Sequence, residues 1–296
     1  MDTVYMDYAA TTPVDERVVE AMLPFFTERF GNPNSLYGLG RDAYRGLEEA
    51  RERVAAGIGA SNPNELLFTG GGTESDNAAI IGITQRLAPQ GGAHVIVSAY
   101  EHHAILEPAH WLEKNGYDVT LLGPRKDGHI HVEDLKAAMR PNTKLVSVMH
   151  GNNEIGALND IAALAQVAHD GGALMHTDAA QTLGKVPFDV EALGVDAASF
   201  SGHKIYGPKG IGALYLKRRT PFEPLLKGGG QEFKKRSGTQ NVPGAQGFAR
   251  ALELMLEEQP TEIERLTRLR DRLILDITTR LENTEPSISE GDRLPN

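Results

Sequence analysis

The sequence predicts an α/β fold, in which a mostly parallel central sheet has helices on both faces and is joined to an incomplete small domain. The first observation is alternation: short apolar runs of strand length are separated mostly by helical segments, an order typical of a parallel sheet covered by helices. The second is the abundance of glycine, 32 residues in 296, as expected where many tight turns join strands to helices. The apolar runs cover residues 66–68, 95–97, 119–122, 145–148, 174–176, 197–200 and 213–216.

Three segments in the first half of the chain have helix signals. Residues 13–29 follow Thr12, a residue type that caps helices, and Pro13 suits the first turn. Residues 41–58 repeat apolar side chains every three or four positions, as in an amphipathic helix with a Glu49–Arg53 pair on its outer face. Residues 104–115 form the third predicted helix, which Gly116 should end.

The chain changes character after Pro260, where one long helix is predicted over 261–282. A turn is expected at 287–292, after which the chain stops, so this last part looks cut short. The sequence therefore predicts three parts, namely an N-terminal segment of the small domain (1–14), the large domain (15–259) and the incomplete start of a C-terminal small domain (260–296).

Composition and charge exclude several classes of function. The net charge of −10, without a basic run, argues against binding to nucleic acid or to an anionic membrane surface. No apolar stretch reaches the length of a membrane span, and the first residues lack the features of a signal peptide, so we expect a cytoplasmic protein. The chain contains no cysteine, which excludes disulfides, thiolate metal sites and a cysteine nucleophile supplied by these residues.

A glycine-rich run, residues 70–75, follows the first strand and opens a helix. Glycines let the backbone approach a phosphate, and free N–H groups at a helix start favour an anion. An ordinary tight turn capped by Thr73 explains the same residues equally well.

Histidines follow the second predicted strand. His102, in Glu101-His102-His103, could stack on an aromatic ring and move protons, although taken alone a surface or capping histidine is the commoner case. The pair His129 and His131 is a weaker candidate for a metal site, because no acidic residue stands at ligand spacing.

Polar residues also end three later strands, at the edge where open α/β sheets bind ligands. Asn153 follows one strand, Asp178 ends the next, and Lys204 follows Ser201 and His203 after the third. A carboxylate there can pair with a protonated pyridine nitrogen, and a lysine can form a Schiff base. Taken alone, each residue is more often an ordinary loop, capping or surface residue. Such purely structural roles do not explain why all of them occur in this order at strand ends.

Taken together, these motifs resemble those of the cysteine desulfurases of the NifS/IscS type, within the class V aminotransferase family. The resemblance implies the large domain of a fold-type I enzyme that uses pyridoxal 5'-phosphate (PLP). It also implies sulfur transfer from L-cysteine, giving L-alanine, for iron–sulfur cluster assembly or other sulfur metabolism. The matching runs are 5–13, 30–35, 72–77, 101–102, 152–156, 178–181, 199–210, 228–232 and 236–239, and they span nearly the whole chain.

The resemblance further implies a role for each matching residue. Lys204 would form the Schiff base and move protons, Asp178 would pair with the pyridine nitrogen, and His102 would stack on the ring and transfer protons. Gln181 would hydrogen-bond the ring hydroxyl, and Asn153 would lie beside the ring near the substrate. The residues expected at the phosphate are Gly72, Thr73, Ser201 and His203, together with Thr239 at the phosphate of the partner subunit, since family members are homodimers.

The chain departs from the family pattern in two places. Residues 36–38 stand where the family usually has a histidine. The family's nucleophilic cysteine, and an arginine for the substrate carboxylate, lie in a C-terminal domain into which residues 293–296 would lead. We therefore expect the chain as given to be inactive in sulfur release. The expected partners are a second copy, L-cysteine and a scaffold or sulfur-acceptor protein.

Two other functions stay open on the sequence alone. The chain could be another class V PLP enzyme, such as a lyase, an epimerase or an aminotransferase, that needs no cysteine. It could also be a non-catalytic cofactor-binding protein that dimerises with a full-length relative or regulates it. An in-frame continuation of the coding sequence with a cysteine would favour the desulfurase.

Overall fold

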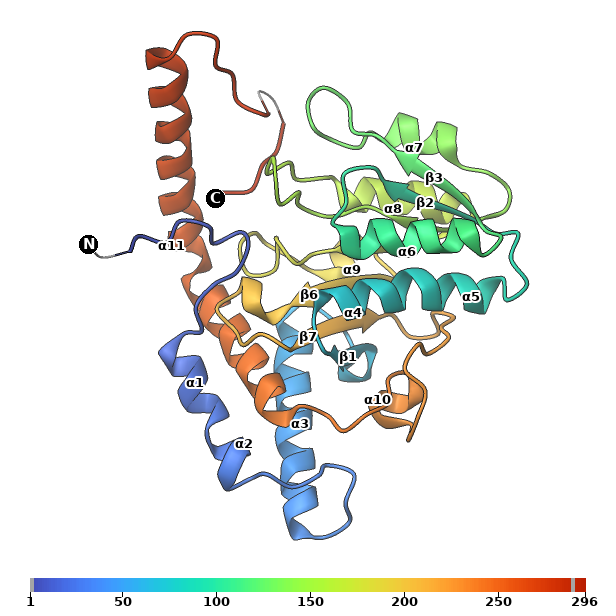
Figure 1. Cartoon of the computed structure of the whole chain (residues 1–296), viewed down its shortest axis with the longest axis vertical. Coiled ribbons are helices and arrows are strands. Elements are labelled where there is room, and N and C mark those ends of the chain that lie inside the picture. Colours follow the sequence, from blue (N-terminus) through green and yellow to red (C-terminus); the bar gives the residue numbers. More distant parts are fainter. Residues whose placement is uncertain (1–2, 289–290) are drawn as a thin grey trace.

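One seven-stranded sheet forms the centre of the computed structural model, which describes residues 3–288 and 291–296 (Figure 1). The strand order is β1-β7-β6-β5-β4-β2-β3, and only β7 runs antiparallel to its neighbours. The seven predicted apolar runs and the mostly parallel sheet are therefore confirmed. The strands are β1 (Leu66–Thr69), β2 (His94–Ser98), β3 (Asp118–Leu122), β4 (Thr143–Ser147), β5 (Leu174–Asp178), β6 (Ala197–Ser201) and β7 (Gly212–Leu216).

Helices cover both faces of the sheet, and the sheet separates two apolar cores. Because side chains alternate along a strand, Leu66 and Phe68 of β1 belong to one core and Leu67 to the other. The first core also contains residues of α3 (Gly38–Gly57), α7 (Val132–Ala138), α8 (Ile161–Asp170), α9 (Val190–Leu193) and the first half of α11 (Val242–Arg280). The second is closed by the π-helical turn η2 (Ala78–Gly82), α5 (Ile83–Leu87) and α6 (His103–Lys114).

The predicted helix 13–29 is in fact two short helices, α1 (Glu16–Met22) and α2 (Pro24–Thr27). The interruption falls at Pro24, which has no N–H to continue the first helix. The predicted cap is also wrong: Asp15 accepts a hydrogen bond from the N–H of Arg17 and caps α1. Thr12 instead donates its hydroxyl to the carbonyl of His203, on the turn after β6.

The helices predicted over 41–58 and 104–115 are confirmed as α3 and α6, and Gly116 follows α6 with a φ of 84°. The predicted Glu49–Arg53 pair is absent. Arg53 instead donates to both carboxylate oxygens of Glu253, on α11, because α11 packs along α3 and offers a partner from another element.

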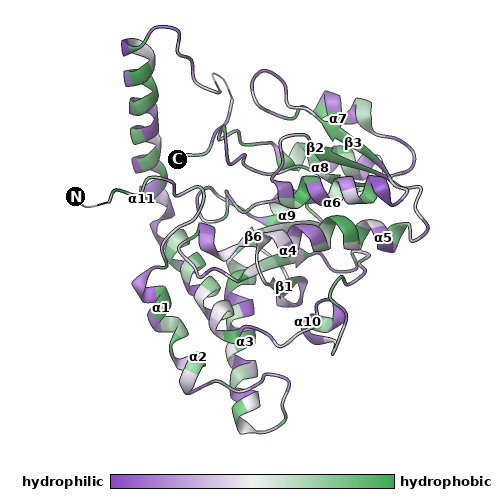
Figure 2. Ribbon diagram, viewed as in Figure 1, coloured by the Kyte–Doolittle hydropathy of each residue, from purple (hydrophilic) through white to green (hydrophobic). Residues whose placement is uncertain are grey.

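The long C-terminal helix begins at Val242, not after Pro260. Pro260 is tolerated inside α11 because it lies on an exposed stretch, where a carbonyl that lacks its N–H partner can be hydrated. Beyond it the helix extends past the sheet (Figure 1), and hydrophobic residues recur along this part (Figure 2). Among them, Leu269, Leu273 and Leu275 are about half exposed. The predicted turn at 287–292 lies partly outside the described residues.

Four short helical elements complete the description. They are η1 (Pro63–Glu65), α4 (Gly72–Asn77), η3 (Gly202–Lys204) and α10 (Gln231–Lys234). Within residues 3–288 and 291–296, no helix combines the length and the apolar character needed to cross a membrane.

Candidate active site

Two parallel strands end side by side at one edge of the sheet and position the candidate site. Asp178 is the last residue of β5 and is paired in register with Ser199 of β6. The chain leaves β6 at Ser201 and makes one 3₁₀ turn, η3, whose last residue is Lys204. The sequence predicts that Asp178 and Lys204 lie close together. In agreement, the positive charge of Lys204 lowers the pKa of Asp178, and the negative charge of Asp178 raises the pKa of Lys204, each against the effect of burial.

Lys204 is half-buried under the N-terminal segment. Its Nζ donates hydrogen bonds to the carbonyl oxygens of Ala9 (2.6 Å) and Ala10 (2.8 Å). Burial lowers the pKa of Lys204, and the negative charges of Asp178 and Asp7 oppose that shift. A lower pKa makes the neutral, nucleophilic amine more available near neutral pH.

Asp178 is buried, and one of its carboxylate oxygens accepts a hydrogen bond from the N–H of Ala180 at 2.8 Å. Burial raises its pKa, while that hydrogen bond and the nearby His102 and Lys204 favour the anion. A buried carboxylate with the Lys204 ammonium nearby is suited to accept a proton or an N–H from a bound ring.

A layer of buried polar side chains lies next to Asp178. His176, two residues earlier on β5, shares hydrogen bonds with the hydroxyls of Ser147 (2.8 Å) and Ser199 (2.9 Å), and burial lowers its pKa to about 3. Asp76 lies 3.9 Å from the same imidazole, and burial followed by the charge of Asp178 raises its pKa well above the usual range. Among the described residues, Asp76 Oδ1 has no hydrogen-bond partner.

Glu101 belongs to the same layer. Its Oε1 accepts hydrogen bonds from the hydroxyl of Ser98 (2.5 Å) and the N–H of Met149 (2.6 Å), whereas its Oε2 has no partner within the part of the chain that the structure describes. Burial raises the pKa of Glu101 to about 8. This carboxyl is therefore mostly protonated at neutral pH.

The glycine-rich run opens α4, as predicted, and lies against the end of β6. A Cβ built on Gly72 would be 3.3 Å from that of Ser201, so the two predicted phosphate residues adjoin each other. Thr73 is exposed in the first turn. The imidazole Nδ1 of His203 is 3.0 Å from the hydroxyl of Thr11, and burial together with the charge of Lys204 lowers its pKa.

His102 caps α6. On the sequence alone, a capping histidine is the alternative to a role at an aromatic ring. Its Nδ1 accepts a hydrogen bond from the N–H of Ala104 at 3.1 Å. In the neutral imidazole the proton is therefore on Nε2, and the exposed side chain keeps this atom available for proton transfer.

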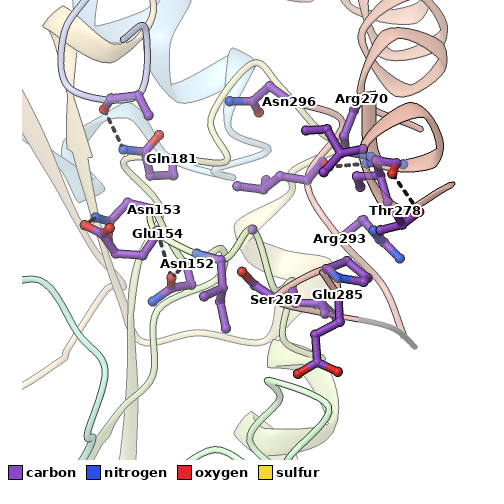
Figure 3. Close-up of a pocket in the computed structure, with 18 residues that line it drawn as sticks. Asn152, Asn153, Glu154, Gln181, Arg270, Thr278, Glu285, Ser287, Arg293 and Asn296 are labelled. Carbon is purple, nitrogen blue, oxygen red and sulfur yellow. Dashed lines mark hydrogen bonds between the residues drawn. The ribbon is translucent and has the colours of Figure 1, made fainter. Parts of the chain in front are cut away.

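Gln181 and Asn153 border a cavity of about 400 Å³ between the strand ends and the second half of α11 (Figure 3). Gln181 is buried, and its Nε2 donates to the carbonyl of Ala9 at 3.0 Å. The amide of Asn153 donates to Glu154 at 2.8 Å. Opposite them lie residues of α11 and of the C-terminal segment, Arg270 and Asn296 among them.

Thr239 is not brought to this cluster. It is exposed in the segment before α11, and within the described residues its side chain makes no hydrogen bond. That segment is nevertheless tied to the glycine-rich run, since Arg236 donates to both carboxylate oxygens of Glu74, at 2.8 and 3.2 Å. Glu74 in turn accepts from the N–H of Gly70 at 2.7 Å.

Sequence reasoning missed four contributors to the site. Asp76 and Glu101 adjoin predicted residues, and their burial has no local signature. Lys185 donates to Gln181 at 3.0 Å, and its spacing of four residues could have indicated this contact. The carbonyls of the N-terminal segment belong to alanines, which carry no chemical signal of their own.

The weak metal candidate has a different explanation. His131 Nε2 lies 2.6 Å from a carboxylate oxygen of Asp127, in the turn that connects β3 to α7. Among the described residues, no three His, Cys, Asp or Glu side chains are grouped so that they could hold a metal ion.

Comparison with known proteins yields one family. The family described as Aminotransferase class-V matches residues 4–288. A cysteine desulfurase IscS of Dictyoglomus turgidum is 48% identical over 293 residues, which are 99% of this chain and 74% of that protein. A cysteine desulfurase IscS of Anaeromyxobacter dehalogenans is 47% identical over 99% of this chain and 72% of its own length.

Solved structures agree. A NifS-like protein superposes with a TM-score of 0.94 and 39% identity, covering 99% of this chain and 80% of that one. A structure described as SspA in complex with cysteine has a TM-score of 0.81 and 41% identity over 85% of this chain and 72% of its own. With this sheet, this site and these relatives, the chain belongs to the class V aminotransferase family, among the cysteine desulfurases of the NifS/IscS type.

Proposed function

We propose that this chain binds PLP at the ends of β5 and β6 and, as part of a cysteine desulfurase, handles sulfur from L-cysteine. The observation that supports the proposal most directly is the placement of Lys204 and Asp178. A half-buried lysine with a lowered pKa and a buried carboxylate end neighbouring parallel strands. Neighbouring ionisable groups with shifted pKa values are typical of active sites.

The residues present fit the phosphate end of PLP. A Cβ on Gly72 would contact Ser201 at 3.3 Å, so a larger residue there would need adjustment, and Gly72 and Thr73 form the first turn of α4, where N–H groups are free to bind an anion. Thr73, Ser201 and His203 add side-chain donors around the same place. In this proposal they hold the phosphate group.

The ring end fits as well. Bound PLP would supply an aldehyde that reacts with amines and a ring that accepts electrons. The Asp178 carboxylate would accept the N–H of the ring nitrogen, and His102 would cover the ring and exchange a proton through Nε2. Gln181 would donate to the ring hydroxyl, and Asn153 would lie at the cavity through which an amino acid approaches.

Lys204 has to exist both bonded and free during such a reaction. When it is free, the carbonyls of Ala9 and Ala10 can hold its ammonium group, as they do in this structure. The pKa of Lys204 is lowered by burial, so the same residue can give up the proton and act as a base.

We further propose a homodimer in which Thr239 reaches the partner's phosphate group. Thr239 is exposed and lies in a segment anchored to the glycine-rich run through Arg236 and Glu74. Exposed apolar side chains on α11 are a second reason to expect a covered surface. The division into 1–14, 15–259 and 260–296 is part of this proposal, with α11 crossing the last boundary.

Removal of sulfur needs a nucleophile on the sulfur atom, and a thiolate is the strongest one that a protein offers near neutral pH. The chain contains no cysteine. We therefore propose that the 296 residues by themselves bind L-cysteine without releasing sulfide in repeated turnovers. Delivery to a scaffold or acceptor protein, for iron–sulfur cluster assembly, would need a thiol from elsewhere.

The experiment is borohydride reduction of the PLP-loaded protein, followed by peptide mapping. We expect a yellow protein and one reduced adduct at Lys204, lost in Lys204→Ala and kept in the control Lys209→Ala. An adduct at Lys209 or Lys185 would show that the site is misassigned. In a parallel assay with L-cysteine and a reductant, steady sulfide release that depends on Lys204 would contradict the proposed inactivity.

A further inference from the structure

Lys185 is a second lysine of the site that the proposed mechanism does not use. It follows Gln181 by four residues in the turn after β5 and is partly buried. Its Nζ donates to Gln181 Oε1 at 3.0 Å. The Nε2 of the same amide donates to the carbonyl of Ala9 at 3.0 Å, and that carbonyl also accepts from Lys204 at 2.6 Å.

This chain of contacts fixes which way the Gln181 amide points. A lysine ammonium can only donate, and a main-chain carbonyl can only accept. Both neighbours therefore demand the same orientation, with the amide oxygen at Lys185 and the N–H group at Ala9. The N–H group thus faces the place where Lys204 lies, which is also where an oxygen of a bound ligand would need a donor.

The surroundings of Lys185 disfavour its positively charged form. Burial lowers its pKa to about 8, and the positive charge of Lys204 acts in the same direction. A lysine needed only for solubility would extend into water, where its charge is fully hydrated. Here the ammonium is withdrawn from water, and the acceptor it contacts is a residue of the site.

We propose that Lys185 is a positioning residue: it locks the Gln181 amide with its N–H toward the place where Lys204 lies. This inference rests on the proposed function, because the amide N–H would serve the ring hydroxyl of PLP.

The test measures PLP dissociation at pH 7 for the wild type, Lys185→Met, Lys185→Arg and the surface control Lys209→Met. Loss of one charge-assisted contact should weaken binding about tenfold in Lys185→Met. Lys185→Arg should recover most of the affinity because it restores a charged donor. Lys209→Met should bind as the wild type does. Wild-type affinity in Lys185→Met would overturn the positioning role.

The wild type separates the two ways in which this test can fail. If the wild type itself does not bind PLP, the proposed function fails. If the wild type binds PLP and Lys185→Met binds it equally well, only the positioning role fails.

Lys185→Gln guards against a folding defect in Lys185→Met. It keeps a neutral donor of similar length, so we expect its affinity for PLP to lie between those of the Met and Arg variants. Circular dichroism and thermal unfolding of all variants would show whether the fold is intact. A Gln variant that binds no better than Met, with both folded, would show that charge rather than hydrogen-bond donation is what Gln181 requires.

Discussion

Two buried groups of charged side chains differ in how completely they are paired. Arg51 of α3 is 1% exposed, yet it donates to both carboxylate oxygens of Glu232, at 2.7 and 2.9 Å, and to the carbonyl of Leu66 at 2.7 Å. Glu232 accepts a further hydrogen bond from the N–H of Phe68. By contrast, Asp76 and Glu101 each keep an oxygen that has no partner among the described residues.

The first group has a structural task. Glu232, Phe233 and Lys234 follow one another with φ of 43°, 57° and 65°, a left-handed stretch that non-glycine residues rarely adopt. The paired Glu232 holds this stretch against β1. Burial by itself would lower the pKa of Arg51, but its contacts with Glu232 and Glu48 together outweigh burial and the pKa is raised.

The second group is left under-paired, and the pKa values of its carboxyls are raised instead. In a fully paired cluster both ions are held in one charge state. A cluster with unpaired oxygens and shifted pKa values can exchange protons near neutral pH. The comparison indicates that an unpaired carboxyl oxygen together with a raised pKa, more than burial alone, distinguishes the region next to Asp178.

Arg51→Met tests the structural group and should have the largest effect. It leaves the Glu232 carboxylate buried without its partner, which typically costs about 3–5 kcal/mol. Urea denaturation at pH 7 measures the loss. The double variant Arg51→Met/Glu232→Met should recover much of it, since no unpaired charge is left. A loss below about 1 kcal/mol in the single variant would mean that the pair contributes little to the fold.

Glu101→Gln tests the under-paired group through pH. Because the pKa of Glu101 is raised to about 8 from 4.5, the folded chain keeps a proton that the unfolded chain loses between these values. The wild type therefore loses stability as pH rises from about 5 to 8, by at most about 4 kcal/mol. Gln does not titrate, so the free energy of unfolding of the variant should rise relative to that of the wild type as the pH increases over this range. A difference that is constant with pH would contradict the raised pKa.

Much of this organisation could be predicted from the sequence, because strands and their ends leave local signals. Apolar runs bounded by turn residues indicated all seven strands. Since Asp178 and Lys204 follow neighbouring runs, their proximity at one edge was predictable once the sheet was taken as parallel. The helix α6 and its stop at Gly116 were likewise encoded locally.

Other features depend on contacts between distant segments. Thr12 could cap a helix by sequence, but its hydroxyl bonds to His203, 191 residues away. Arg53 has a suitable partner in Glu49, but α11 brings Glu253 to it instead. The carbonyls that hold Lys204 come from alanines some 195 residues earlier. Main-chain acceptors and tertiary partners have no pattern in the sequence.

Asp76→Asn should have a small effect, which separates Asp76 from Asp178. Burial and the charge of Asp178 raise the pKa of Asp76, which favours the neutral carboxyl, a group similar in shape to an amide. We expect the free energy of unfolding at pH 7 to change by less than about 1 kcal/mol, with PLP still bound. The matched variant Asp178→Asn should lose tight PLP binding. A much larger destabilisation in Asp76→Asn would show that Asp76 is ionised.

A similarly small effect on stability is expected at the contact between the segment before α11 and the glycine-rich run. Arg236 and Glu74 are about one-quarter exposed, so their pair resembles a surface ion pair more than the Arg51–Glu232 pair. Arg236→Met should therefore cost no more than about 1 kcal/mol in urea denaturation, and less at high salt, which screens exposed charges.

The effect of Arg236→Met on PLP binding should be larger than its effect on stability, because Glu74 accepts from Gly70 and anchors the start of the glycine-rich run. Without Arg236 that run should hold phosphate less firmly, and PLP should dissociate faster from Arg236→Met than from the control Arg17→Met, whose pair with Glu258 lies on α1 and α11. Equal dissociation rates in the two variants would mean that the segment before α11 and the glycine-rich run act independently.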